Sequence, residues 1–123
     1  MNKKLVIVTL QLLSLLIIPF VVQGATITTC TFDKDTYQQG EIGYITISIY
    51  NDKNTEIRIT ELTATINYYY TDGAVYLQSF STNATLPAEI QQGYSSTLYI
   101  RFSLPTNIAS GYTDVHVKAK TEQ

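Results

Sequence analysis

The side chains most often used in catalysis and metal binding are scarce in this chain. It has one histidine, His116, one cysteine, Cys30, and one methionine, Met1. A Ser-His-Asp triad would depend on His116, and the sharp turn that presents a nucleophile is missing. Zinc and blue-copper sites need several His and Cys ligands. We therefore predict that the protein is not an enzyme and that it uses no metal or cofactor.

Acidic side chains offer one alternative, a calcium site at the end of a loop. Asp33 and Asp35 are close in the sequence, and Asp52 or Asp72 would supply further oxygen ligands. The spacing is not that of an EF-hand, and Lys34 stands between the first two carboxylates. We therefore favour solvated turn residues over a calcium site.

Tyrosine is the residue type best suited to binding, with ten copies in the chain and no tryptophan. Alternation along the expected strands turns one group of these side chains outward: Tyr44, Tyr50, Tyr69 and Tyr99. Exposed aromatic rings on a sheet can stack on sugars or dock a protein. Tyrosine is also common in strands that bind nothing, so this group is a candidate interaction surface and not a motif.

Two further positions carry covalent chemistry. Asn83-Ala84-Thr85 is an acceptor for N-glycosylation because its middle residue is not proline. Cys30 is expected to be a small apolar residue of the first strand. An exported cysteine with no partner in its own chain can pair with another chain, so an intermolecular disulfide is the alternative for Cys30.

Residues 1–24 have the composition of an export segment. Lys3 and Lys4 give a positive start, and the run Leu5–Val22 that follows carries no charge. The run has 18 residues, which is about the minimum for a helix that spans a membrane. The sequence therefore predicts an N-terminal hydrophobic helix, either a signal peptide or an uncleaved anchor.

The end of this segment favours cleavage. Val22 and Gly24 are compact residues at the −3 and −1 positions, which would leave Ala25 as the first residue of the processed protein. Cleaved or not, the segment predicts that residues 25–123 lie outside the cytoplasm, secreted or held at the membrane through residues 5–22.

Charge excludes one class of partner. Without residues 1–24 the 8 basic residues become 6, against 10 acidic ones, so the net charge is −4. Nucleic acids are negatively charged and bind positively charged protein surfaces, so we expect an acidic domain to have no nucleic-acid partner. The 99 residues left are close to the usual size of one domain and are enough to bury a core. We expect a single domain over residues 25–123.

Alternation of apolar and polar residues with a period of two dominates residues 26–120, and no helical period is present. It predicts strands over residues 26–32, 43–50, 57–70, 74–80, 97–104 and 112–120, and a loop over residues 81–92. Within the third of these strands the apolar positions change from odd, as in Ile59, to even, as in Leu62. A bulge or break near Thr60-Glu61 is needed to keep both sets inward.

The segment Phe32–Glu41 resembles the opening of immunoglobulin-like modules found in prokaryotic, particularly archaeal, cell-surface and adhesion proteins. In these modules an Asp-Lys pair precedes an aromatic residue and a turn glycine, here Tyr37 and Gly40. The ending, with Leu104-Pro105 and then Gly111-Tyr112, is similar. The resemblance implies an immunoglobulin-like β-sandwich of six to seven antiparallel strands at a cell surface, and it implies no catalytic residue.

Together these observations predict an all-β, non-enzymatic structural or interaction module, secreted or on the cell surface, with an adhesive role. It would bind through a sheet face or edge, and its partner would be another surface protein, a second copy, or a glycan. One alternative is a carbohydrate-binding module that uses the exposed tyrosines. Another is an envelope or filament subunit that keeps its N-terminal anchor.

Overall fold

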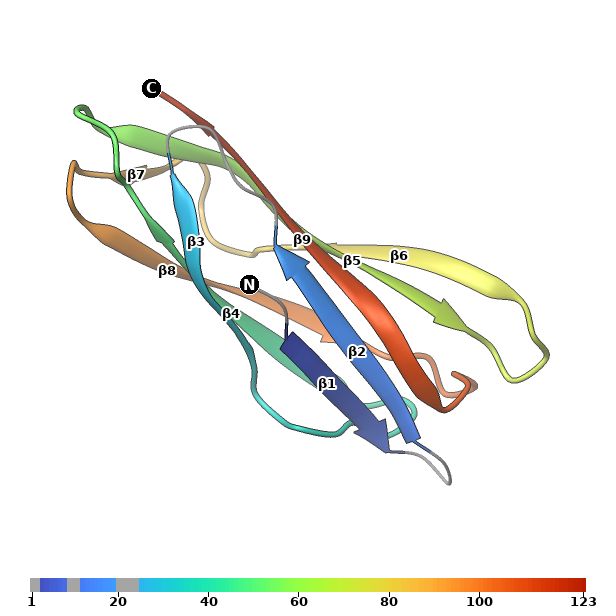
Figure 1. The fold of residues 1–123 in the computed structure, drawn as a ribbon. Helices are drawn as coiled ribbons and strands as arrows, with labels where there is room; N and C mark the ends of the chain where they lie inside the picture. The colour runs from blue at the N-terminus through green and yellow to red at the C-terminus, as the bar shows by residue number, and fades with distance from the viewer. Residues whose placement is uncertain (1–2, 9–11, 20–24) are drawn as a thin grey trace.

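The computed structural model describes residues 3–8, 12–19 and 25–123 and shows an all-β protein. The strands form two sheets (Figure 1). The long sheet has the order β1-β2-β9-β5-β6, and β7 also pairs with β5. The three-stranded sheet has the order β3-β4-β8. The strand bounds are β1 Lys3–Val8, β2 Leu12–Pro19, β3 Thr26–Phe32, β4 Ile42–Tyr50, β5 Ile57–Tyr69, β6 Val75–Ser81, β7 Ala88–Ile90, β8 Ser95–Ser103 and β9 Gly111–Glu122.

Alternation of side chains between the two faces of each strand builds the core. The three isoleucines Ile45, Ile47 and Ile49 of β4 are fully buried, and β8 brings Ile100 and Phe102 against the same core. The inward residues of the long sheet complete it: Ile57, Ile59, Leu62, Ala64, Ile66 and Tyr68 of β5, and Val115, Val117 and Ala119 of β9. These are the apolar sets predicted from the sequence, and their inward orientation is confirmed.

The phase change predicted in the long strand is confirmed as a bulge. The pairing of β5 with β9 shifts register between Ile59 and Glu61. Thr60 is the extra residue, and its hydroxyl donates to the carbonyl of Lys120 at 3.2 Å. The bulge therefore lets both Ile59 and Leu62 face the core.

One end of the core is a cluster of aromatic rings. Tyr37, the aromatic residue of the segment Phe32–Glu41, is fully buried, and its ring centroid lies 5.2 Å from that of Phe102. Gly40 adopts a φ of 73°, which confirms the predicted glycine turn. Gly43 was not singled out by the sequence. A Cβ atom there would lie 2.3 Å from ring atoms of both Tyr37 and Phe102.

The structure differs from the sequence prediction in two places. The segment 81–92, predicted to be a loop, contains the short strand β7, which pairs with Ile57–Ile59 of β5. The predicted N-terminal helix is not confirmed, because residues 3–8 and 12–19 form strands. Among the residues that the structure describes, no helix could cross a membrane.

Candidate functional site: the edge of β9

Strand β9 lies inside the long sheet, between β2 and β5. One side of β9 pairs with β5. The other side pairs with β2 and, at Gly111, with Ile7 of β1, and both of these strands belong to the predicted export segment. The pairing with β2 is parallel, and its register runs from Leu13 opposite Gly111 to Pro19 opposite Val117. Figure 1 shows β2 along β9, on the side where β3 is the edge of the other sheet. We call residues 111–117, on the side facing β2, the β9 edge.

The inner face of this strand belongs to the core. Thr113, Val115 and Val117 are buried, with 6%, 0% and 0% of their surface exposed. The register places Leu15 and Ile17 opposite Thr113 and Val115, so an apolar segment accompanies the buried positions of β9. If that segment were removed, the buried residues Thr113, Val115 and Val117 would border a side of the core that β2 no longer covers.

The outer face of β9 is charged. Asp114 and His116 are half-buried and Lys118 is exposed. Across the sheet they lie opposite Asn67, Thr65 and Thr63 of β5, which are all uncharged. Within the part of the chain whose side chains are described, neither Asp114 nor Lys118 forms an ion pair. Both charges are therefore available to a strand that takes the place of β2.

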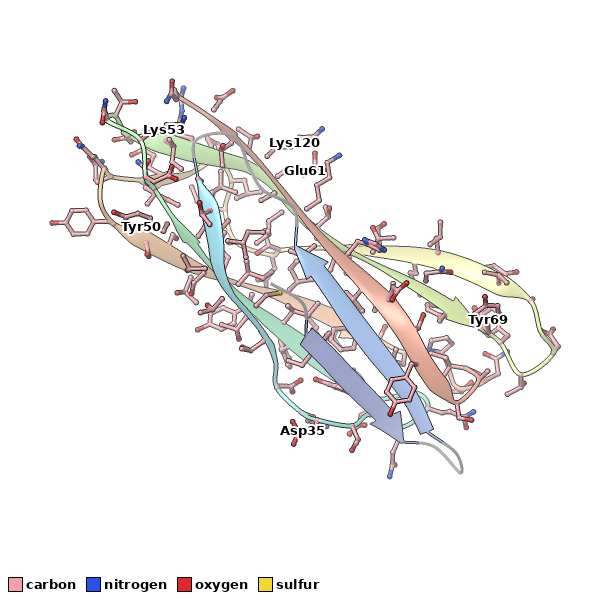
Figure 2. The ribbon with its side chains drawn as sticks, in the orientation of Figure 1. Asp35, Tyr50, Lys53, Glu61, Tyr69 and Lys120 are labelled. Atoms are coloured by element: carbon pink, nitrogen blue, oxygen red, sulfur yellow. The ribbon has the colours of Figure 1, made fainter. Side chains whose placement is uncertain are left out.

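The predicted tyrosine surface divides between the two sheets. Tyr44, Tyr50 and Tyr99 lie on the outer face of the three-stranded sheet, with 44%, 37% and 54% of their surface exposed. Tyr44 lies opposite Arg101 and Tyr99 opposite Thr46, so these two tyrosines are diagonal neighbours. Tyr69 is 49% exposed on the long sheet. Figure 2 labels Tyr50 and Tyr69 at opposite ends of the molecule.

An apolar patch beside Tyr69 was missed by the sequence analysis. Val75 lies opposite Tyr69, Leu77 lies two residues further along β6, and Tyr112 begins the outer face of β9. Their exposed fractions are 55%, 69% and 66%. The signal was present in the alternation of β6, where Val75 and Leu77 share the outer face with Tyr69. It was obscured because Tyr76 stands between Val75 and Leu77 and interrupts the alternation of apolar and polar residues.

The two positions with covalent chemistry differ in accessibility. Asn83 is exposed in the connection between β6 and β7, where the amide of Ala84 donates to the hydroxyl of Thr82 at 3.3 Å. A glycan there would meet solvent. Cys30 is fully buried in β3, as expected for an apolar strand residue. An intermolecular disulfide would need its side chain to leave the core. Gly24, next to the predicted cleavage point before Ala25, lies outside the described residues.

Of the four carboxylates considered for calcium, Asp35 is exposed and the other three accept local hydrogen bonds. Asp33 accepts hydrogen bonds from the hydroxyl of Tyr37 and, at 3.0 Å, from the amide of Tyr44. Asp52 accepts from Thr26 at 3.4 Å, and Asp72 accepts from the amide of Ala74 at 2.9 Å. Over the described ranges, no three His, Cys, Asp or Glu side chains gather as metal ligands would.

Three pKa shifts mark local contacts rather than a reactive site. The hydrogen bond from Lys34 lowers the pKa of Glu41, and the same contact raises the pKa of Lys34. Burial raises the pKa of Tyr68 to about 12, and a hydrogen bond with Tyr70 adds to the shift. Tyr68 also donates to Gln78, and its ring meets that of Tyr70 edge-on at 5.6 Å. None of these groups lies in the β9 edge.

The chain matches no protein-family model, no characterised protein and no solved structure.

Proposed function

We propose that the protein is an exported, non-enzymatic interaction module of the immunoglobulin-like β-sandwich class, which binds through the β9 edge. One observation carries this proposal. The strand that covers the β9 edge comes from residues 12–19, which belong to the segment with the composition of a signal peptide. Cleavage before Ala25 would leave a row of unpaired backbone N–H and C=O groups on β9. Such a row is a template for another strand.

The arrangement of the two sheets supports the sandwich class. The three-stranded sheet and strands β9, β5 and β6 enclose one core with residues from both. On one side β6 meets β8, where Phe80 lies 6.4 Å from Phe102 and the hydroxyl of Thr82 donates to the carbonyl of Tyr99 at 2.8 Å. On the other side β3 and β9 are not paired with each other, and β1 and β2 of the predicted export segment both contact the two strands. Binding would therefore occur on that side.

Site-specific photo-cross-linking in the exported protein tests this function. The full gene is expressed in a host that exports it, with a photoreactive residue at His116 of β9 or at Tyr99 of the three-stranded sheet. Tyr99 is the matched control because it is exposed on a strand far from the β9 edge. Mass spectrometry of the surface and medium fractions gives the N-terminus, the glycan state of Asn83 and the adducts.

We expect an N-terminus at Ala25 and adducts from position 116. Adducts from position 99 alone would move binding from the edge to the sheet face. A protein that remains in the cytoplasm would overturn the proposed function as a whole.

A sugar-binding role is the second candidate, favoured by the diagonal pair Tyr44 and Tyr99. Two exposed rings on neighbouring strands can offer a flat surface to a sugar. Glycan-array binding that is lost in Tyr99→Ala and kept in Tyr69→Ala would support it, because Tyr69 lies on the other sheet. No binding to any glycan would exclude it.

A further inference from the structure

We propose that two processed copies of the protein pair through their β9 edges, antiparallel, about a two-fold axis at His116. We further propose that residues 12–19 prevent this pairing until they are removed. The inference rests on the proposed function and names its partner, a second copy of the chain. The long sheets of the two copies would then continue into each other through an isologous interface.

The charge pattern of β9 suits a second copy. In an antiparallel pair centred on His116, Asp114 of each copy lies opposite Lys118 of the other, because both are two residues from the centre. Opposite charges at directly opposed positions stabilise a strand pair, and the two-fold axis makes the contact twice. In the structure neither side chain has a charged partner among the residues described. The edge is therefore complementary to itself.

The buried side chains of β9 are compatible with the same register of the antiparallel pair. Val115 of each copy would lie opposite Val117 of the other, and both side chains are fully buried when β2 is in place. Processing would uncover this row on the open side of the core, and the second copy would cover it again with the same two side chains. Apolar burial on one face and charge pairing on the other thus select one alignment.

Neighbouring registers are less favourable. A shift of one residue would place inward side chains of one copy opposite outward side chains of the other. A centre at Val117 would place Asp114 opposite Lys120. However, Lys120 already contacts Glu61 of β5, with 3.3 Å between Nζ and Oε2. Figure 2 labels these two side chains on adjacent strands of the long sheet. The centre at His116 uses charges that have no other partner among the described residues.

The N-terminal strand occupies the same backbone groups. Residues 13–19 pair with residues 111–117, and an antiparallel dimer centred on His116 needs that edge. A chain that keeps β2 in this position cannot form the dimer. The segment would therefore act as an intramolecular cover that keeps the edge from pairing before export is complete.

Charge reversal in the exported protein tests the pairing. The full gene is expressed with export, the protein is collected from the medium, and its N-terminus is determined. Sedimentation equilibrium from micromolar to millimolar concentration then measures dimerisation of the native sequence and of Asp114→Lys, Lys118→Asp and the double variant. Lys53→Asp is the matched control because it makes the same charge change at an exposed loop position. Thermal unfolding shows that each variant is folded.

We expect a reversible dimer that begins at Ala25. Each single reversal should weaken it by about tenfold or more, because two attractive contacts become repulsive. The double variant should return to the native affinity, and Lys53→Asp should not change it. Recovery in the double variant would show that the single variants fail through charge and not through misfolding.

Four results would overturn the inference: a processed protein that stays monomeric, an exported protein that keeps residues 12–19, a double variant no better than the single ones, or a dimer broken by Lys120→Asp but not by Lys118→Asp. Monomeric protein together with adducts from position 116 to a different surface protein would leave the proposed function standing. The second copy alone would then be the wrong partner.

Discussion

Asn51 holds the turn after β4 through three hydrogen bonds from one buried side chain. Its Nδ2 donates to the carbonyl of Thr55 at 2.8 Å and to that of Ile90 at 2.9 Å. Its Oδ1 accepts from the amide of Lys53 at 2.9 Å. The side chain is fully buried, so water cannot replace these bonds. The residue therefore ties this turn to β7.

Asn51→Ala should strongly destabilise the protein, because it leaves three backbone groups without their partner. We expect a loss of about 3 kcal/mol in the free energy of unfolding, measured by urea denaturation. Asn54→Ala is the control, since Asn54 is exposed in the same turn, and it should change that free energy by less than about 0.5 kcal/mol. Equal effects of the two substitutions would contradict the role assigned to Asn51.

Because of Tyr68, the free energy of unfolding should change with pH in the alkaline range. Burial raises the pKa of its hydroxyl from 10.0 to about 12 in the folded protein. The neutral form is favoured by folding, so its contribution is complete below pH 10 and is lost as the pH rises toward about 12.

Tyr68→Phe should make the fall in unfolding free energy between these pH values shallower, as measured by urea denaturation at a series of alkaline pH values. Tyr69→Phe is the control, because Tyr69 is 49% exposed on the opposite face of the same strand. A pH dependence that is identical in the native protein and Tyr68→Phe would show that the burial of this hydroxyl is not its cause.

At the scale of the element, the bulge in β5 decides which side chains reach the core. Deletion of Thr60 would remove the extra residue and leave Glu61 next to Ile59, so both apolar sets would still face the core in a regular ladder. We expect this variant to keep cooperative unfolding in circular dichroism, whereas deletion of Thr63 would turn the residues after it toward solvent and should abolish cooperative unfolding. Thr60→Ala keeps the register and removes only the 3.2 Å hydrogen bond to Lys120, so it should cost about 1 kcal/mol. Loss of cooperative unfolding on deletion of Thr60, or its retention on deletion of Thr63, would refute this account.

The bulge also shows what the sequence can predict. The strands over residues 26–122 and their inward faces follow from alternation, because half-buried strands need one apolar and one polar face. β7 was missed because three residues, Ala88–Ile90, are too few to show a period. The uncharged run of β2 has apolar residues at almost every position. Its period therefore cannot distinguish a strand from a helix.

The candidate site was less predictable than the fold. The pairing of β2 with β9 joins residues about 100 positions apart, and local patterns carry no information on such partners. Asp114 and Lys118 occupy outward positions of the alternation in the last predicted strand, but their place beside the export segment appears only in the pairing of β9 with β2. Tyr44 and Tyr99 show the converse. Their outward orientation followed from alternation, whereas their diagonal placement needed the register of β4 with β8.

At the scale of the whole molecule, the two sheets meet on one side through β6 and β8 and on the other side through β1 and β2 of the predicted export segment. Hydrogen exchange can test this asymmetry, because it reports the bonding of each backbone amide. Along β9, alternate amides point toward β5 and toward the β9 edge. Removal of residues 1–24 should therefore affect only the second set, and the amides bonded to β5 serve as an internal control.

In the processed Asp114→Lys variant, which should be monomeric, we expect rapid exchange at every second amide between Thr113 and Val117. The intervening amides should exchange slowly because they remain hydrogen-bonded to β5. In the processed native sequence, the rapid set should slow as protein concentration rises, since the second copy then supplies acceptors. If both sets were slow at every concentration, another part of the same chain would cover β9, and the molecule would have no open side.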